Sequence, residues 1–73
     1  MKLSEGLKRV RKLQSKTQHE IAMTLGITDR GYQSYELEER EPPISKLMLL
    51  ADYYDVSLDY LVGRADTPCL PEA

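Results

Sequence analysis

The sequence predicts an all-α fold, a compact domain of five short helices. Apolar residues recur at intervals of three and four through most of the chain, which is the spacing of one face of an α-helix. These stretches are separated by Thr, Ser, Gly and Pro residues that start or stop helices. With 73 residues, 41% of them hydrophobic and 30% charged, the chain can bury one core. We expect one domain over residues 1–63 and a flexible tail over residues 64–73.

The first predicted helix covers residues 3–14. Its apolar residues stand at positions i, i+4 and i+7 and should face the core: Leu3, Leu7 and Val10. Ser15 and Lys16 follow, and neither is apolar. Because an apolar residue just before an N-cap can fix the angle at which the chain joins a helix, this corner is expected to lack that hydrophobic staple.

The second predicted helix begins at Thr17, the first residue of a capping box that ends at Glu20. In such a box the Thr hydroxyl accepts a hydrogen bond from the backbone N–H three residues on, and the Glu side chain accepts one from the Thr N–H. Apolar residues follow at helical spacing: Ile21, Ala22 and Leu25. Gly26 then supplies the left-handed conformation that ends many helices, so this helix should end at Leu25.

A third helix is predicted after a very short turn. Thr28 is its N-cap candidate, and Asp29 places a negative charge at the positive end of the helix dipole. Tyr32 and Tyr35 are three residues apart and share one face, which we assign to the core. The opposite face carries four polar side chains: Asp29, Arg30, Gln33 and Ser34.

The short turn favours a helix-turn-helix over an antiparallel hairpin. Ala22 is small where the two helices must approach, which suits a steep crossing. Arg and Gln on the exposed face can each form two hydrogen bonds at once, with guanine and adenine edges respectively. Residues 17–36 therefore predict a helix that reads the major groove of DNA, with a hairpin that only packs a core as the alternative.

A charged loop and a fourth helix follow. The loop over residues 37–43 ends in Pro42 and Pro43, which cannot sit inside a helix. The fourth helix covers residues 44–54, and its apolar stripe consists of Ile44, Leu47, Leu50, Ala51 and Tyr54. Asp55 takes the C-cap position.

Ser57 caps a fifth helix that extends to about Val62 and ends at Gly63. Residues 64–73 have no periodicity and contain two prolines, which predicts a flexible tail. The single cysteine, Cys69, cannot form an internal disulfide, and neither a signal peptide nor a membrane segment is visible. We therefore expect a cytoplasmic protein that does not bind membranes.

Charge is distributed unevenly along the chain. The net charge of −2 by itself disfavours nucleic acid, because Lys and Arg must neutralise phosphates. Residues 1–16 contain six Lys and Arg side chains and one Glu, so this segment carries +5 and the rest of the chain carries −7. Such a domain can turn a basic face to DNA, although a basic run on a terminal helix is more often only a solvated surface.

The sequence contains no catalytic or metal-binding pattern. A metal site needs clustered His and Cys ligands, and covalent catalysis needs a nucleophile beside a base. The chain has one His, one Cys and no Gly-rich phosphate loop. We therefore expect no enzyme activity and no cofactor, and we expect His19 to face solvent.

Over most of its length the chain resembles the lambda-repressor-like, Cro/cI-type helix-turn-helix family, also called the Xre family. The matching positions are Leu7, Val10, Arg11, Thr17-Gln18, Glu20-Ile21-Ala22, Leu25-Gly26-Ile27, Tyr35-Glu36, Pro43, Leu47, Leu50-Ala51, Val56-Ser57, Asp59-Tyr60-Leu61 and Gly63. The resemblance implies a compact five-helix domain that acts as a sequence-specific transcriptional regulator, and we expect a repressor of bacterial or phage type. Ser15 and Lys16 depart from the family, which usually has Gly and an apolar residue there.

The resemblance also implies roles for individual residues. Its base-facing positions are occupied by Asp29, Arg30, Gln33 and Ser34. Thr17, Gln18, Thr28 and Arg40 are expected to face phosphates. Lys16, where the chain departs from the family, is expected to contact a phosphate as well. Arg11 and Glu36 match a structural ion pair between the first and third helices. Arg30 is expected to pair with guanine and Gln33 with adenine, while Asp29 either accepts from cytosine or only stabilises the helix N-terminus.

Double-stranded DNA is the partner that this interpretation implies. One domain of this size makes few base contacts, so we expect a homodimer on a palindromic operator. The alternative is a protein-interaction module of the same fold, such as an antitoxin-type domain or the target of an anti-repressor. An exposed apolar patch around Leu58, Tyr60 and Leu70 would favour that alternative.

Overall fold

The computed structural model describes residues 1–65, and five helices make up this part of the chain. They are α1 (Leu3–Leu13), α2 (Gln18–Leu25), α3 (Asp29–Glu36), α4 (Ile44–Tyr54) and α5 (Leu58–Leu61). No residue from 1 to 65 lies in a β-strand. The predicted all-α class is thus confirmed, and each helix has the predicted bounds to within about one residue. Cys69 and Leu70 lie outside the described residues.

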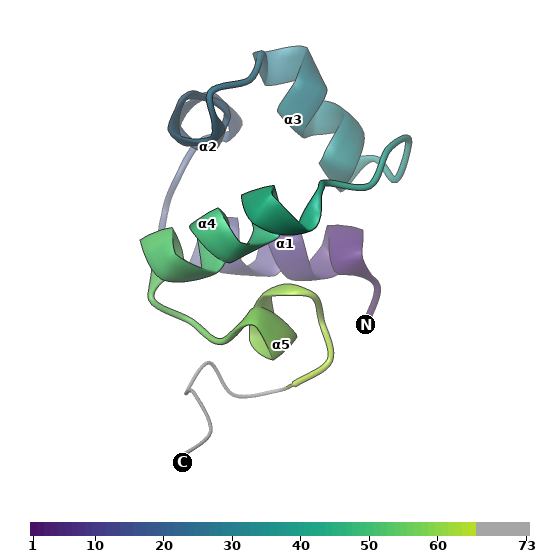
Figure 1. The fold of residues 1–73 in the computed structure, drawn as a ribbon, viewed down its shortest axis with the longest axis vertical. Coiled ribbons are helices and arrows are strands. Elements are labelled where there is room, and N and C mark those ends of the chain that lie inside the picture. The colour runs from purple at the N-terminus through teal and green to yellow at the C-terminus, as the bar shows by residue number, and fades with distance from the viewer. Residues whose placement is uncertain (66–73) are drawn as a thin grey trace.

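The helices surround one small core. Figure 1 shows α2 and α3 at one end of the molecule, α5 toward the other, and α1 and α4 spanning the region between them. α2 packs on α3 and α4, while α1 packs on α3 and α5, and α4 also packs on α5. None of the helices described is long and apolar enough to cross a membrane.

All five helices contribute side chains to the core. The buried apolar residues are Leu7, Val10, Ile21, Ala22, Leu25, Tyr32, Tyr35, Leu47, Leu50, Ala51, Tyr54, Tyr60 and Leu61. Tyr32 and Tyr35 are buried, as predicted, and their rings meet edge to face with centroids 6.3 Å apart. The buried face of α3 therefore anchors it on the domain, and its other face is left to solvent.

Ile44 was predicted to join the core, and this is wrong. Its side chain is 62% exposed. It is the first residue of α4, one turn before Leu47, which is the first buried residue of this helix. Periodicity gives the direction of a side chain and not whether another element lies beneath it.

The predicted helix caps are present. The Thr17 hydroxyl accepts from the Glu20 N–H at 3.1 Å, and the Glu20 carboxylate accepts from the Thr17 N–H at 3.3 Å. Gly26 ends α2 in the left-handed conformation at φ 71°. The Thr28 hydroxyl accepts from the Gly31 N–H at 3.0 Å. These local bonds fix the lengths of α2 and α3 and leave only Gly26 to Thr28 as the turn between them.

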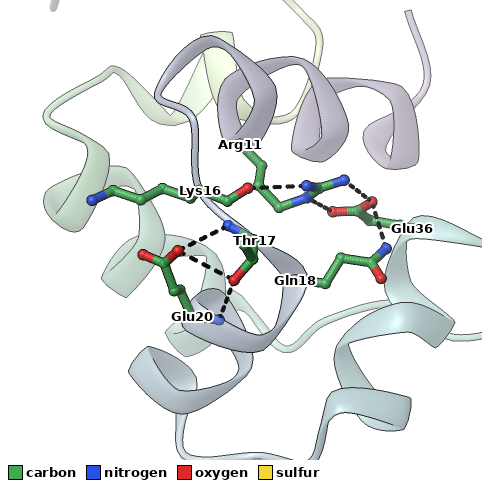
Figure 2. A network of polar contacts seen from close by, with 6 residues as sticks. All are labelled: Arg11, Lys16, Thr17, Gln18, Glu20 and Glu36. Carbon is green, nitrogen blue, oxygen red and sulfur yellow. Dashed lines mark hydrogen bonds and ion pairs between the residues drawn. The ribbon is translucent and has the colours of Figure 1, made fainter.

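The corner between α1 and α2 is held by a polar contact in place of the missing staple. Ser15 adopts a left-handed φ of 56°. The guanidinium of Arg11 reaches across and donates from Nη1 to the carbonyl of Lys16 at 3.1 Å (Figure 2). Arg11 therefore fixes the approach of the chain to α2, a role that an apolar residue before the N-cap would otherwise fill.

The backbone continues in contact with the domain just past the predicted boundary at residue 63. The N–H groups of Arg64 and Ala65 both donate to the carbonyl of Asp59, at 2.7 and 3.2 Å. Arg9 donates from Nη2 to the carbonyls of Tyr60 and Ala65, at 2.6 and 3.2 Å. Residues 64 and 65 are thus fastened to α5 and α1, and residues 66–73 of the predicted tail lie outside the described part.

Candidate nucleic-acid interface

The exposed face of α3 carries three of the four predicted base-contacting residues. Asp29 and Arg30 are exposed in the first turn, and Gln33 is partly exposed one turn later. The side chain of Gln33 makes no hydrogen bond to any residue from 1 to 65. Its amide is therefore free to donate and accept outside the protein, as recognition of an adenine edge requires.

Ser34 does not lie on this exposed face, so its prediction as a base contact is corrected. It is only 6% exposed, and its hydroxyl donates to the Gly31 carbonyl at 2.6 Å. The chain after α3 folds back over it, since the N–H groups of Glu39 and Arg40 both donate to the Ser34 carbonyl, at 2.9 and 3.3 Å. This loop covers most of Ser34. The sequence of α3 by itself gives no sign of that cover.

Arg30 and Arg40 are brought together by the same loop. Both line a shallow hollow of about 290 Å³, with Thr28, Gly31 and the little of Ser34 that is exposed on the α3 side and Glu39 on the loop side. Both arginine side chains are exposed. Two guanidinium groups and the Thr28 hydroxyl beside a hollow form a surface suited to an anion such as a phosphate.

Each exposed charge in the first turn of α3 has a partner within the protein. Arg30 donates from Nη2 to Glu39 Oε1 at 3.2 Å. Asp29 Oδ1 lies 2.8 Å from His19 Nδ1, so a side chain of α2 meets the first residue of α3. His19 faces solvent as predicted, with 64% of its side chain exposed, but the sequence did not indicate this pairing.

A buried ion pair links α1 to the end of α3, as predicted. Arg11 donates from Nε to Glu36 Oε2 at 2.7 Å and from Nη2 to Oε1 at 3.0 Å (Figure 2). The two side chains are 13% and 2% exposed. Two parallel hydrogen bonds between planar groups fix orientation as well as distance. The pair therefore holds α3 at a set angle to α1.

Gln18 completes this network. Its Nε2 donates to Glu36 Oε1 at 3.1 Å, so helices α1, α2 and α3 all meet at one carboxylate. Burial alone would raise the pKa of Glu36, but the hydrogen bonds to that carboxylate, above all from Arg11, outweigh burial and hold its pKa below the ordinary value. The carboxylate is thus charged at neutral pH.

Two buried tyrosine hydroxyls lie near this cluster. Neither Tyr32 Oη nor Tyr54 Oη has a hydrogen-bond partner of good geometry among residues 1–65. Burial raises the pKa of both phenols, so both stay protonated. These hydroxyls belong to the core beneath α3 and not to the face that it exposes.

The five predicted phosphate contacts are not equally placed. Thr28 and Arg40 border the hollow beside α3. Thr17 and Gln18 lie at the N-terminus of α2, where the Thr17 hydroxyl is also within 3.2 Å of Glu20 Oε1 and one Gln18 N–H is used by Glu36. The Lys16 side chain extends away from Gln18 in Figure 2, and its ammonium lies 5.9 Å from the centroid of the Tyr53 ring on α4.

Fewer cations of the basic segment over residues 1–16 are free to contact phosphates than its charge of +5 indicates. Arg11 is bound to Glu36, and Arg9 stacks over the Tyr60 ring at 3.8 Å while donating to backbone carbonyls. Tyr60 is buried and Leu58 is partly buried, so neither supplies the exposed patch that would have favoured a protein-interaction module, and Leu70 lies outside the described residues. Two of the six cations counted in this segment are thus used within the protein, Arg9 between α1 and α5 and Arg11 between α1 and α3.

Sequence reasoning missed two polar contacts that position the interface. Lys46 on α4 donates from Nζ to the Leu25 carbonyl at 2.6 Å, which satisfies the C-terminal end of α2. Glu39 pairs with Arg30 across nine residues. The two residues of each pair are too far apart in the sequence to share a helix face. No periodic pattern therefore indicates either contact.

Residues 1–65 contain no group of three or more His, Cys, Asp or Glu side chains that could hold a metal ion. The arrangement offers hydrogen-bond donors, acceptors and positive charges on a fixed helix. Arg and Gln side chains are among those that bind phosphates and base edges.

Comparison with known proteins agrees with this geometry. A family model described as Helix-turn-helix matches residues 7–61. The chain is 42% identical over 62 residues to the uncharacterized HTH-type transcriptional regulator YobD of Bacillus subtilis, covering 85% of this chain and 55% of that protein. It is 39% identical over 64 residues to the cryptic phage CTXphi transcriptional repressor RstR of Vibrio cholerae, covering 88% of this chain and 57% of that protein.

A solved structure gives the same result. The crystal structure of a transcriptional regulator from Listeria innocua superposes with a TM-score of 0.80 and 35% sequence identity, over 90% of this chain and 62% of that one. The chain spans about half the length of the curated relatives that it matches. Its helices, its short turn and these similarities together show that the chain belongs to the lambda-repressor-like helix-turn-helix family of DNA-binding domains.

Proposed function

We propose that this protein is a sequence-specific transcriptional regulator that places α3 in the major groove of an operator. The observation that carries the proposal is that α3 is fixed by its buried face and by the Arg11–Glu36 pair, while Arg30 and Gln33 extend from its other face. A recognition helix needs both properties, because base contacts require side chains held in register with the groove.

The proposed base contacts are Arg30 with guanine and Gln33 with adenine. Asp29 retains two proposed roles, acceptor from cytosine or stabiliser of the α3 N-terminus, and its pairing with His19 favours the second. Thr28 and Arg40, beside the hollow, are the phosphate contacts that the geometry supports best, with Thr17 and Gln18 at the α2 N-terminus as further ones. Lys16, directed toward Tyr53, has the weakest support.

Selection of bound sequences from a random duplex pool at low salt tests this proposal. An enriched inverted repeat with half-sites about one helical turn apart would support a regulator that binds as a dimer. A salt titration on the enriched site then measures the phosphate contribution. Absence of enrichment would contradict sequence reading by α3.

Repression is the mode of action that we propose, by occupation of the operator. One relative of this chain is named a transcriptional repressor of a phage. We also propose that the protein acts in the cytoplasm, where its DNA would be, and that it needs no cofactor and catalyses no reaction. These proposals extend what the family membership alone establishes, which is a DNA-binding domain.

The outer face of α4 favours a second function, association with another protein chain. Four large apolar side chains on this helix are exposed: Ile44, Met48, Leu49 and Tyr53. The opposite side of α4 is buried in the core, and the exposed side also carries two polar residues, Ser45 and Asp52. Several large apolar side chains gathered on one exposed helix are typical of a surface that a partner covers. We propose that a second copy covers this face in a homodimer, with a different protein partner as the alternative.

A further inference from the structure

Glu39 forms an ion pair with Arg30, the side chain that we propose contacts guanine. The Arg30 guanidinium donates from Nη2 to Glu39 Oε1 at 3.2 Å, on the rim of the hollow that Arg40 also lines. Both side chains remain accessible, with 70% of Arg30 and 49% of Glu39 exposed. A carboxylate oxygen at this distance from a guanidinium takes the place that a phosphate or base oxygen of DNA would take.

The backbone holds Glu39 in this position. Its N–H donates to the Ser34 carbonyl at 2.9 Å, so the residue is fastened to α3 itself. The preceding residue, Glu38, adopts a left-handed φ of 64°, which turns the chain back toward the helix. The Arg40 N–H donates to the same carbonyl at 3.3 Å. The backbone of Glu39 is therefore held beside α3 by the fold, which keeps its carboxylate within reach of Arg30.

We infer that Glu39 is an intramolecular competitor of DNA, which occupies Arg30 in the free protein and lowers the affinity of each protomer for duplex DNA. This inference rests on the proposed DNA-binding function. A DNA oxygen that takes the place of Glu39 Oε1 at Arg30 Nη2 displaces Glu39, and the carboxylate is then left beside the phosphates. The affinity of the domain is thus set partly by a loop residue that touches no base.

The effect has a bounded size. An exposed ion pair of this kind contributes about 0.2–1 kcal/mol, which corresponds to a change in affinity of about fivefold at most. Salt screens such a pair, so the effect is largest at low ionic strength. A residue of this kind adjusts affinity and does not switch binding on or off.

The test compares Glu39→Gln with Glu38→Gln. Glu38 is the neighbouring carboxylate and pairs with Lys2 at 3.7 Å. Its side chain is 50% exposed, and that of Glu39 is 49% exposed. Both variants raise the net charge by one and keep the side-chain size, so general electrostatics change equally. Affinity for the selected site and for a random duplex is measured by fluorescence anisotropy at low salt, in the wild-type and Arg30→Ala backgrounds.

We expect Glu39→Gln to bind DNA about two- to fivefold more tightly than Glu38→Gln. In the Arg30→Ala background this advantage should disappear, because the residue that Glu39 competes for is gone. Glu39→Gln could bind more tightly than Glu38→Gln while every variant binds the selected site and the random duplex equally well. That result would support competition by Glu39 and contradict sequence reading by α3.

Equal affinity of the two variants would overturn the inference and leave the proposed function intact, since only net charge would then matter. Weaker binding of Glu39→Gln to the selected site would also overturn it, because Glu39 would then orient Arg30 for DNA. If no variant binds any duplex at low salt, the proposed function and this inference both fail.

Discussion

Arg30 and Arg40 occupy one hollow beside α3 and are proposed to play different parts there. Arg30 extends from the first turn of α3, whereas Arg40 belongs to the loop after that helix. Only the first is carried by the helix that enters the groove in the proposed complex. The two arginines can therefore be separated by experiment, because a base contact is specific for sequence and a phosphate contact is not.

We expect Arg30→Ala to weaken binding to the selected site by about 1–3 kcal/mol more than binding to random duplex DNA. Arg40→Ala removes the same charge and should weaken binding to both DNAs alike. Gln33→Ala should behave as Arg30→Ala does, and Ser34→Ala should leave the sequence preference unchanged because Ser34 is buried. Binding constants on the two duplexes measure these differences. Equal losses for Arg30→Ala on both would place Arg30 among the phosphate contacts.

Glu36 makes stability depend on pH. Its pKa in the folded protein lies below the ordinary value of 4.5. The unfolded chain therefore takes up a proton at this site at a higher pH than the folded one, and stability falls as the pH falls from about 4.5 through the folded pKa. This contribution is fully present at neutral pH.

We expect Glu36→Gln to cost about 3 kcal/mol of unfolding free energy at neutral pH, because it leaves Arg11 without its charged partner in a buried setting. The difference from wild type should narrow at about pH 3, below the ordinary pKa, because the unfolded wild-type chain then takes up a proton at this residue. Urea unfolding at both pH values measures it, with Glu41→Gln, an exposed carboxylate in the loop, as the control. A difference that does not change with pH would show that Glu36 acts through packing alone.

At the scale of helices, α1 and α5 approach so closely that only glycine fits between them. A Cβ built at Gly6 would overlap the Leu61 carbonyl and would lie 3.0 Å from the Gly63 nitrogen. In an exposed helix, Gly→Ala ordinarily stabilises by about 1 kcal/mol. Here the neighbouring atoms are backbone and cannot move aside without shifting α5.

Gly6→Ala should therefore destabilise the protein by about 1–3 kcal/mol, against the helix propensity. Lys12→Ala, at an exposed position of α1, should change stability by less than about 0.5 kcal/mol. Thermal and urea unfolding of both variants measure the contrast. Stabilisation by Gly6→Ala would mean that α5 moves away from α1 at little cost.

The elements themselves were predictable because their signals are local. Thr17, Gly26, Thr28 and Ser57 are caps that act within four residues, and each is found in its predicted role. Ile44 was placed wrongly because its burial depends on what lies under the first turn of α4. Local chemistry fixes where a helix begins and ends, and tertiary packing decides which of its residues are covered.

At the scale of the whole molecule, the domain has two exposed faces of different character. The α3 face is polar and charged, whereas the α4 face is apolar, with Met48 56% and Leu49 40% exposed. A groove of about 300 Å³ beside the apolar face is lined by Met48, Ala51, Asp52, Asp55, Val56 and Leu58. Separate faces allow one copy to bind DNA and another chain at the same time.

We expect Met48→Glu to prevent association of two copies, since it places a charge in the apolar face that we propose is covered. Leu13→Glu makes the same change in charge at a residue of α1 that is 68% exposed, and should leave association unchanged. Sedimentation equilibrium, with and without the selected duplex, reports the mass. A single wild-type copy bound to a duplex that carries both half-sites would contradict the proposed homodimer. The search would then turn to a different protein partner.

By itself the sequence determined the five helices, their caps, the burial of Tyr32 and Tyr35 and, through its resemblance to a family, the Arg11–Glu36 pair. These follow from spacing and from chemistry within one or two turns. Only the tertiary structure decided that Ser34 is covered and that Arg30 is held by Glu39. Both depend on the path of the loop after α3, and contacts made where a loop folds back have no period in the sequence.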